Sequence, residues 1–217
     1  MGNKRLFYGS AVLLALLGQP ALAEDGAWYV VLHGGIATIE PDQNTIDNSL
    51  INANAQFPNL SPQTAVRDGN DSTWKAAIGY RVNRNFALEF GYASLGEYQL
   101  RTTTTNPATT FNHTVEINAF SVDALGIKPI NDRLSLYGRF GVTSWEQTGL
   151  AFDRSAIPGF SFDDRGGSIK VGLGLSYAVG KRAQLRLEWE RYINTGEEDA
   201  LGTIDVDVAS VGLTVDF

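Results

Sequence analysis

Alternation of apolar and polar residues is the clearest pattern in this chain, and it recurs in segments of about ten residues. In the last segment, 211–217, every second side chain is apolar and the residues between are Gly, Thr and Asp. A period of two places successive side chains on opposite faces of a strand, so each strand has one apolar face and one small or polar face. The alternation predicts eight strands, at 27–39, 74–82, 86–95, 115–128, 134–146, 168–179, 183–192 and 204–217.

The predicted connections between these strands alternate between long and short. Tight turns are expected at 83–85, 129–133 and 180–182. Long loops rich in Asn, Thr, Asp, Gly and Pro are expected at 40–73, 96–114, 149–167 and 194–203. An even number of strands with tight turns at one rim and long loops at the other is typical of an up-and-down barrel. In such barrels of the outer membrane the short turns are periplasmic and the long loops are extracellular.

The chemistry of the two faces distinguishes a membrane barrel from a soluble one. Aromatic side chains recur on one parity, as in Trp28, Trp74, Phe90, Tyr92, Tyr177, Trp189 and Phe217. The opposite parity combines charges with glycine, as in Lys75, Gly79, Arg81, Glu89, Gly91, Lys170, Gly172, Gly174, Arg186 and Glu188. A soluble lipocalin-like barrel or sandwich would place its apolar face inside, and a glycine-rich charged face suits a narrow lumen instead. We therefore predict an all-β fold, an eight-stranded antiparallel up-and-down transmembrane β-barrel.

Residues 1–23 have the features of a secretory signal peptide. Lys4 and Arg5 precede an apolar run, and the small residues Ala21 and Ala23 form an A-x-A cleavage site. A membrane anchor is the alternative, but the apolar run is shorter than the roughly 18 residues that a spanning helix needs. We expect a signal peptide at 1–23 and one barrel domain at 24–217, exported to the cell outer membrane.

Charge and cysteine content exclude several classes of function. The formal net charge is −7, which argues against a nucleic-acid partner. The absence of cysteine excludes disulfides, thiolate catalysis and Cys-ligated metal sites. An exported protein without disulfides needs another source of stability, and a closed hydrogen-bonded sheet provides one.

Several segments resemble the transmembrane domain of the OmpA family. Segment 74–96 looks like the second and third strands of that domain, whereas 132–141 and 184–189 look like its fifth and seventh strands. The resemblance extends over nearly all of 24–217 and implies a lumen filled by carboxylates and guanidinium groups. By matching position, that network would contain Glu89, Arg139, Arg186 and Glu188, with Glu89 paired to Arg186.

Other properties of the OmpA family transfer only in part. A second charged pair of that family falls on Ser176 and Leu125, where both charges are absent, so the resemblance does not imply a conduction gate based on partner exchange. The terminal aromatic Phe217 resembles the closing residue of outer-membrane barrels, and the resemblance implies an assembly signal for the barrel-assembly machinery. OmpA continues into a peptidoglycan-binding domain, and we expect none in this chain after the eighth strand.

These observations predict a structural, envelope-integrity or surface-interaction role for a barrel whose lumen is plugged by salt bridges. An eight-stranded barrel has room inside only for side chains or one small ligand. The alternatives are a narrow channel for small solutes or ions and a lipid-modifying enzyme. Neither His33 nor His113 occurs in the His-x-Ser arrangement of small-barrel lipid A deacylases, so we expect no enzyme activity.

We expect no cofactor and no metal site. The acidic residues at 163–164 and 197–199 lack the spaced ligand series of a Ca²⁺ loop. The expected partners are outer-membrane lipid and lipopolysaccharide, the barrel-assembly machinery, and an extracellular ligand bound through the loops.

Overall fold

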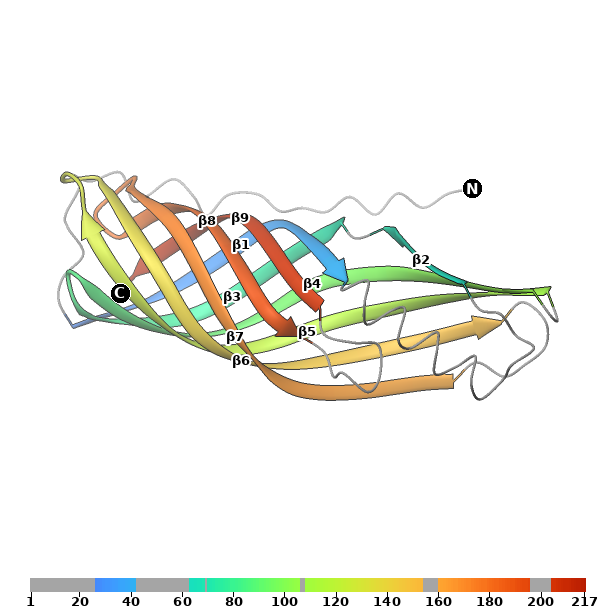
Figure 1. Ribbon diagram of the computed structural model, residues 1–217. Coiled ribbons are helices and arrows are strands. Elements are labelled where there is room, and N and C mark those ends of the chain that lie inside the picture. Colours follow the sequence, from blue (N-terminus) through green and yellow to red (C-terminus); the bar gives the residue numbers. More distant parts are fainter. Residues whose placement is uncertain (1–25, 42–62, 69, 106–107, 154–159, 196–203) are drawn as a thin grey trace, which may run out of the picture.

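The computed structural model describes residues 26–41, 63–68, 70–105, 108–153, 160–195 and 204–217. Within these ranges the chain forms nine β-strands of a single sheet (Figure 1). The strands are β1 (Ala27–Pro41), β2 (Gln63–Asp68), β3 (Asn70–Asn83), β4 (Phe86–Thr105), β5 (Ala108–Pro129), β6 (Leu134–Asp153), β7 (Phe160–Ala178), β8 (Ala183–Thr195) and β9 (Ile204–Asp216). The expected signal peptide at 1–23 lies outside the described residues. Among the described residues, no helix is both long enough and apolar enough to cross a membrane.

The sheet closes on itself through antiparallel pairs. Sequential strands from β3 to β9 pair with one another, and β1 pairs with both β3 and β9. The closing pair extends from Tyr29 opposite Asp216 to Pro41 opposite Ile204. β2 and β3 pair with successive parts of β4, so together they occupy one position in the barrel. The predicted closed eight-stranded antiparallel barrel is therefore confirmed.

The tight turns predicted from the sequence are present at 83–85, 129–133 and 180–182. In the first, the backbone N–H of Asn85 donates to Asn83 Oδ1 over 2.8 Å. In the second, Asn131 Oδ1 accepts from the N–H groups of Arg133 and Leu134 at 2.9 and 2.8 Å. Asparagine suits such positions because its short side chain can bond to the backbone a few residues away.

The prediction of long loops at 96–114 and 149–167 is wrong, because the strands continue through most of both segments. β4 and β5 stay paired out to Thr105 opposite Ala108, and β6 and β7 out to Ala151 opposite Phe160. β2 likewise lies inside the segment 40–73 that was expected to be a loop.

The physical reason is that apolar alternation in these extensions never runs beyond a few residues, as the threonines at 102–105 illustrate. Backbone pairing does not require such alternation, so the strands continue where the alternation stops. We call the projecting part of β2 and β4–β7 the raised wall (Figure 1).

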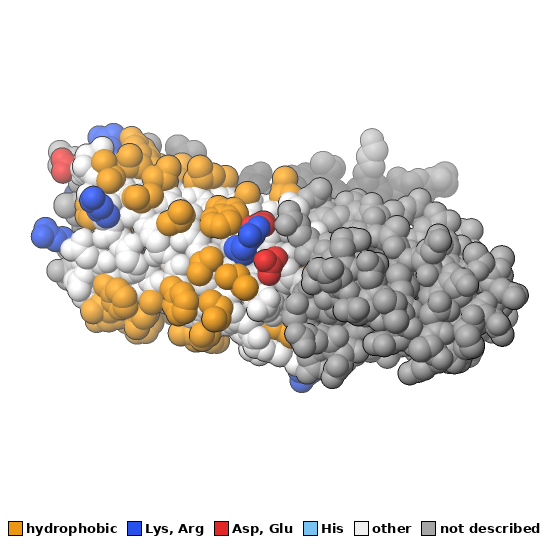
Figure 2. Space-filling view, viewed as in Figure 1, with side chains coloured by type: hydrophobic (Ala, Val, Ile, Leu, Met, Phe, Trp, Pro, Cys, Tyr) orange, Lys and Arg blue, Asp and Glu red, His pale blue; other side chains and the backbone are white. Residues whose placement is uncertain are grey.

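The apolar face of the barrel points outward. Leu32 is 63% exposed and Phe90 55% exposed, whereas Lys170 is 0% exposed and Glu89 2% exposed. Apolar side chains are spread over the outer surface of the barrel (Figure 2). This distribution is the reverse of a soluble barrel, so the lipocalin-like alternative is excluded and the outer face is a surface for lipid.

Along β9 the inward positions keep one parity while their chemistry changes. The buried positions are Ile204, Val206, Val208, Ser210, Gly212, Thr214 and Asp216. The first three are apolar and the other four are small or polar. The positions between them change in the opposite sense, from Asp205 and Asp207 to Val211 and Val215. Pairing with β1 stays in register throughout, so no bulge causes the change.

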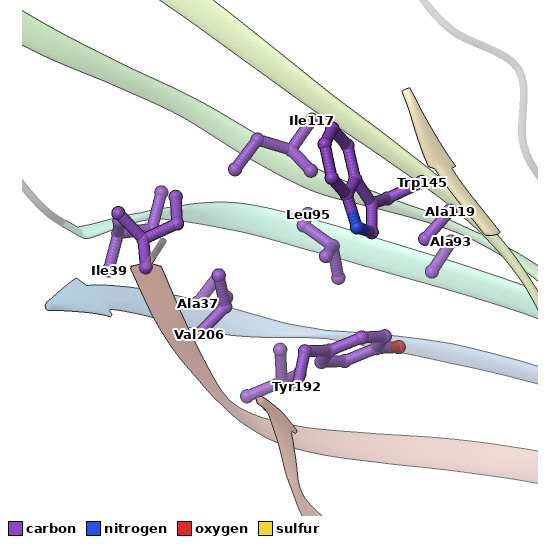
Figure 3. Close-up of a cluster of buried hydrophobic side chains, with 11 residues drawn as sticks. Ala37, Ile39, Ala93, Leu95, Ile117, Ala119, Trp145, Tyr192 and Val206 are labelled. Carbon is purple, nitrogen blue, oxygen red and sulfur yellow. The ribbon is translucent and has the colours of Figure 1, made fainter. Parts of the chain in front are cut away.

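The barrel thus has two sections stacked along its axis. In the section nearer the turns, which we call the lipid-type section, apolar residues face outward and polar residues inward, as lipid requires. In the section nearer the loops, the outside is polar and the inside apolar, as in a water-soluble protein. There the interior holds the loop-side cluster (Figure 3), formed by Ala37, Ile39, Ala93, Leu95, Ile117, Ala119, Trp145, Tyr192, Ile204, Val206 and Val208.

A second, smaller apolar group lies at the other end of the lumen. This turn-side cluster consists of Tyr29, Ala87, Leu125 and Tyr137, with Ile127 packed against it. The register of β4 with β5 runs through both clusters, as the pairs Ala87–Leu125, Glu89–Asp123 and Ala93–Ala119 demonstrate. Charged residues therefore occupy the layer between two apolar groups.

Candidate functional site

Glycines on the inward parity make room for long side chains in the central layer of the lumen. A Cβ at Gly141 would lie 1.9 Å from Asp123 Oδ1, and one at Gly174 would lie 2.3 Å from Cζ of Tyr137. Both positions therefore need glycine if the facing side chain is to stay where it is. The glycine-rich parity of the sequence is explained by these contacts across neighbouring strands.

Glu89 lies at the centre of the network and uses both carboxylate oxygens. Its Oε1 accepts from Arg186 Nη1 at 2.6 Å and from the Tyr29 hydroxyl at 2.8 Å. Its Oε2 lies 2.7 Å from Arg139 Nη2. Arg186 also stacks near the rings of Tyr29 and Tyr137, with Cζ 5.2 and 5.3 Å from the two ring centroids. Two guanidinium groups thus share one carboxylate.

Arg139 connects four carboxylates from three strands. Besides Glu89, its Nη1 donates to Asp123 Oδ2 at 2.8 Å, and its Nη2 donates to Glu188 Oε2 at 2.9 Å. Its Nε lies 3.5 Å from Glu190 Oε1. Because a guanidinium carries five N–H donors in one plane, it can contact several carboxylates at once, which an ammonium group does less well.

Two lysines complete the network. Lys75 pairs with Glu188 and, at 2.7 Å, with Glu190 Oε2. Lys170 Nζ lies 2.9 Å from Asp123 Oδ2 and 3.1 Å from Glu190 Oε1. Together, four cations face four carboxylates, and none of these side chains is more than 6% exposed. The layer is therefore neutral overall, as burial of charge requires.

The structure brings the four expected lumen residues, Glu89, Arg139, Arg186 and Glu188, into one cluster. Sequence reasoning missed Asp123 and Glu190, although both lie on the inward parity of their strands. The positions of the absent OmpA-type pair are also inward. Leu125 lies in the turn-side cluster, and the Ser176 hydroxyl donates to Gln184 Oε1 at 2.6 Å.

His33 has a neighbour that sequence reasoning did not anticipate. Its Nδ1 lies 3.0 Å from the Ser210 hydroxyl, and no described residue bonds to its Nε2. The adjoining cavity measures about 10 Å³, enough for a single water molecule. This His–Ser pair therefore has no space for a lipid substrate beside it.

No group of three or more His, Asp or Glu side chains able to hold a metal ion occurs in the described part of the chain. The side chains of His113, Asp163 and Asp164 and the segment 197–199 lie outside the described part.

The unequal sharing of partners predicts unequal effects of substitution. Glu89→Ala leaves Arg186 without a carboxylate and should cost about 3–5 kcal/mol of unfolding free energy. Arg186→Ala should cost less, because Glu89 keeps Arg139 and Tyr29. The double variant should cost well below the sum of the two, measured by urea unfolding in detergent or lipid.

The control for this cycle is Glu146→Ala. Glu146 pairs with Arg165 at 2.7 Å on the outer face, where the side chains are 44% and 68% exposed. Its loss should cost no more than about 1 kcal/mol. Additive effects of the two lumen substitutions would refute the coupling of Glu89 and Arg186.

Comparison with known proteins agrees with the fold and its chemistry. Residues 9–217 match the profile of the family described as outer membrane protein beta-barrel domain. Outer membrane protein A of Salmonella typhi is 32% identical over 143 residues, which cover 64% of this chain and 38% of that protein. Outer membrane protein A of Serratia marcescens is 27% identical over 212 residues, covering 95% of this chain and 55% of that protein. The chain thus spans about half the length, or less, of these relatives.

Solved structures share the fold at low sequence identity. Ail, the attachment invasion locus protein of Yersinia pestis, has a TM-score of 0.52 and 13% identity, covering 89% of this chain and 99% of Ail. Neisserial surface protein A has a TM-score of 0.55 and 16% identity, covering 89% of this chain and 100% of that protein. With the family match, the sequence relatives and the closed barrel in agreement, the chain belongs to the outer membrane protein beta-barrel domain family and is an OmpA-like barrel of the outer membrane.

Proposed function

We propose that this protein is a non-conducting structural barrel that supports the integrity of the outer membrane. The observation that carries the proposal is the layered filling of its lumen. An ion crossing the barrel would have to separate the salt bridges around Glu89 and Arg139 and then pass the loop-side cluster. Leaving a buried charge unpaired costs several kcal/mol, and an apolar constriction resists wetting. Either layer alone opposes conduction.

Conductance in planar bilayers tests the two layers separately. The refolded protein should give no channel steps, and neither should Glu89→Ala with Arg186→Ala, since the loop-side cluster remains. Adding Trp145→Ala to that pair removes the largest ring of the cluster and should produce steps.

The matched control adds Trp189→Ala instead, because Trp189 is 42% exposed on the outer face. Steady current through the unmodified protein would overturn the proposal and support the narrow channel.

A surface-interaction role is a second candidate, favoured by the raised wall. The wall carries the chain beyond the lipid-type section, where contacts with envelope components or an external ligand become accessible (Figure 1). Ail shares the barrel fold and is named an attachment protein. The lipid-facing belt supports contacts with phospholipid and lipopolysaccharide as well.

Shortening the β4–β5 hairpin separates the two roles. Glu97 pairs with Glu116, so residues 98–115 can be replaced by Asn-Gly without changing the register below. In cells lacking the protein, this variant should restore exclusion of a hydrophobic dye as well as the full chain does. If cells with the shortened variant exclude the dye but no longer aggregate and sediment, the raised wall is assigned to surface contacts.

The control for this experiment is a hairpin of full length with scrambled residues. If the shortened variant folds but leaves the membrane permeable to the dye, the barrel without its extension is not sufficient for the structural role, and that proposal is refuted.

We also propose that Phe217 serves recognition by the barrel-assembly machinery. Its ring is 65% exposed on the outside, and its backbone N–H donates to Trp28 O at 2.9 Å. Phe217→Ser should lower outer-membrane yield strongly, while the refolded variant loses no more than about 1.5–3 kcal/mol of stability.

Phe140→Ser is the matched control for Phe217. It removes an outward ring of 56% exposure from β6, away from the chain end. Equal yields of the two variants in cells would exclude a special role for the terminal ring.

A further inference from the structure

The turn-side end of the lumen opens into a recess that the salt-bridge network does not fill. A cavity of about 110 Å³ lies there, large enough for several water molecules or one small anion. Its polar lining consists of Arg81, Arg84, Asp132, Arg133, Ser135, Ser176 and Gln184. We call this cavity the turn-side recess.

Arg81 contributes a buried and poorly compensated charge to the recess. The residue is 5% exposed, and the carboxylate facing it belongs to Asp216, with Oδ1 3.5 Å from Nη2. Asp216 is shared, because its Oδ2 also accepts from Gln184 Nε2 at 3.2 Å. The Nε and Nη2 atoms of Arg81 make no hydrogen bond with any described residue. Guanidinium groups of the central network, by contrast, have carboxylates within 3 Å.

Two further arginines converge on the same recess from separate turns. Arg84 lies in the β3–β4 turn and Arg133 in the β5–β6 turn. Both are exposed, and neither forms an ion pair with a described residue. Asp132 is the one carboxylate in the lining. Three guanidinium groups therefore outnumber the acids around one cavity, although the chain as a whole is acidic.

We propose that the turn-side recess binds a phosphate-bearing anion. Guanidinium groups recognise phosphate through paired N–H donors, and three of them around one cavity match its several oxygens. The Ser176 hydroxyl and the Gln184 amide add neutral polar groups to the lining of the turn-side recess. A bound anion would add to the partial compensation that Asp216 gives Arg81, since a buried charge without full compensation is costly.

The phosphate could come from a free ion or from a phospholipid head group at the rim. The recess lies on the inward parity, because Arg81, Ser176 and Gln184 all face the lumen. A free phosphate can enter directly, whereas a head group has to reach over the turns.

The test is calorimetric titration of inorganic phosphate into the full chain refolded in maltoside detergent, with chloride at equal ionic strength as the reference. We expect saturable binding that Arg84→Gln with Arg133→Gln weakens by about tenfold or more. Asp132→Asn should tighten binding by about threefold, because it removes the repelling carboxylate. These rim variants leave the lumen network intact, so the test does not require Arg81→Gln to fold.

The matched control is Lys181→Gln with Arg182→Gln, which removes the same charge from the neighbouring turn, outside the recess. If both double variants weaken phosphate binding equally, the binding depends on the overall positive charge of the rim and not on the recess, which would overturn the proposal. Tighter binding of calcium than of phosphate, or no saturable binding of either inorganic phosphate or phosphatidylglycerol bicelles, would overturn it too. Saturable binding of the bicelles alone, lost in the recess variant and kept in the control, would identify the lipid head group as the source.

Discussion

Closure of the backbone hydrogen-bond ladder is the constraint from which the rest of this structure follows. Hydrocarbon offers no partner to a free N–H or C=O group, so a sheet within it must have no open edge. The pairing of β1 with β9 removes that edge. Closure at eight positions fixes a lumen only wide enough for side chains. Inward residues must therefore satisfy one another, because water cannot solvate them as it does at a surface.

The central network is the consequence of that narrow space. Arg139 can occupy it because carboxylates reach it from β4, β5 and β8, and because glycine leaves the facing positions empty. Lys75 and Lys170 then neutralise the remaining carboxylate charge. Replacing Arg139 or Glu89 therefore disturbs several partners at once. Such a network stabilises one side-chain arrangement and leaves little freedom for the partner exchange that gating would need.

The sequence predicts the barrel well where lipid enforces alternation and poorly where it does not. Strands within the lipid-type section were recognisable because their outer face has to be apolar. The extensions of β4–β7 were not, since both of their faces tolerate polar residues. The loop-side cluster was missed for a related reason. Around residues 209–210 the apolar positions change parity, which by itself is indistinguishable from a slip in register.

The network illustrates the same limit at the level of single residues. Parity selects the inward set, which includes Glu89, Arg139, Arg186 and Glu188, but it does not determine which side chains meet across the lumen. Asp123 lies two residues after Ser121, and Glu190 lies two after Glu188. The period of two therefore places both on the inward face of their strands. Their partners, Lys170 and Lys75, became evident only from the register and tilt of strands far apart in the sequence.

The two ends of the lumen differ in a way that bears on function. The loop-side end is filled by apolar side chains, whereas the turn-side end holds a recess beside the incompletely compensated Arg81. The charges between them are already matched, so a ligand has little to gain by displacing them. On the two proposals made above, anion binding belongs to the turn-side rim and surface contacts belong to the raised wall. Each rim can then change its chemistry independently, because the ion pairs of the central network lie between the two ends and use residues of neither rim.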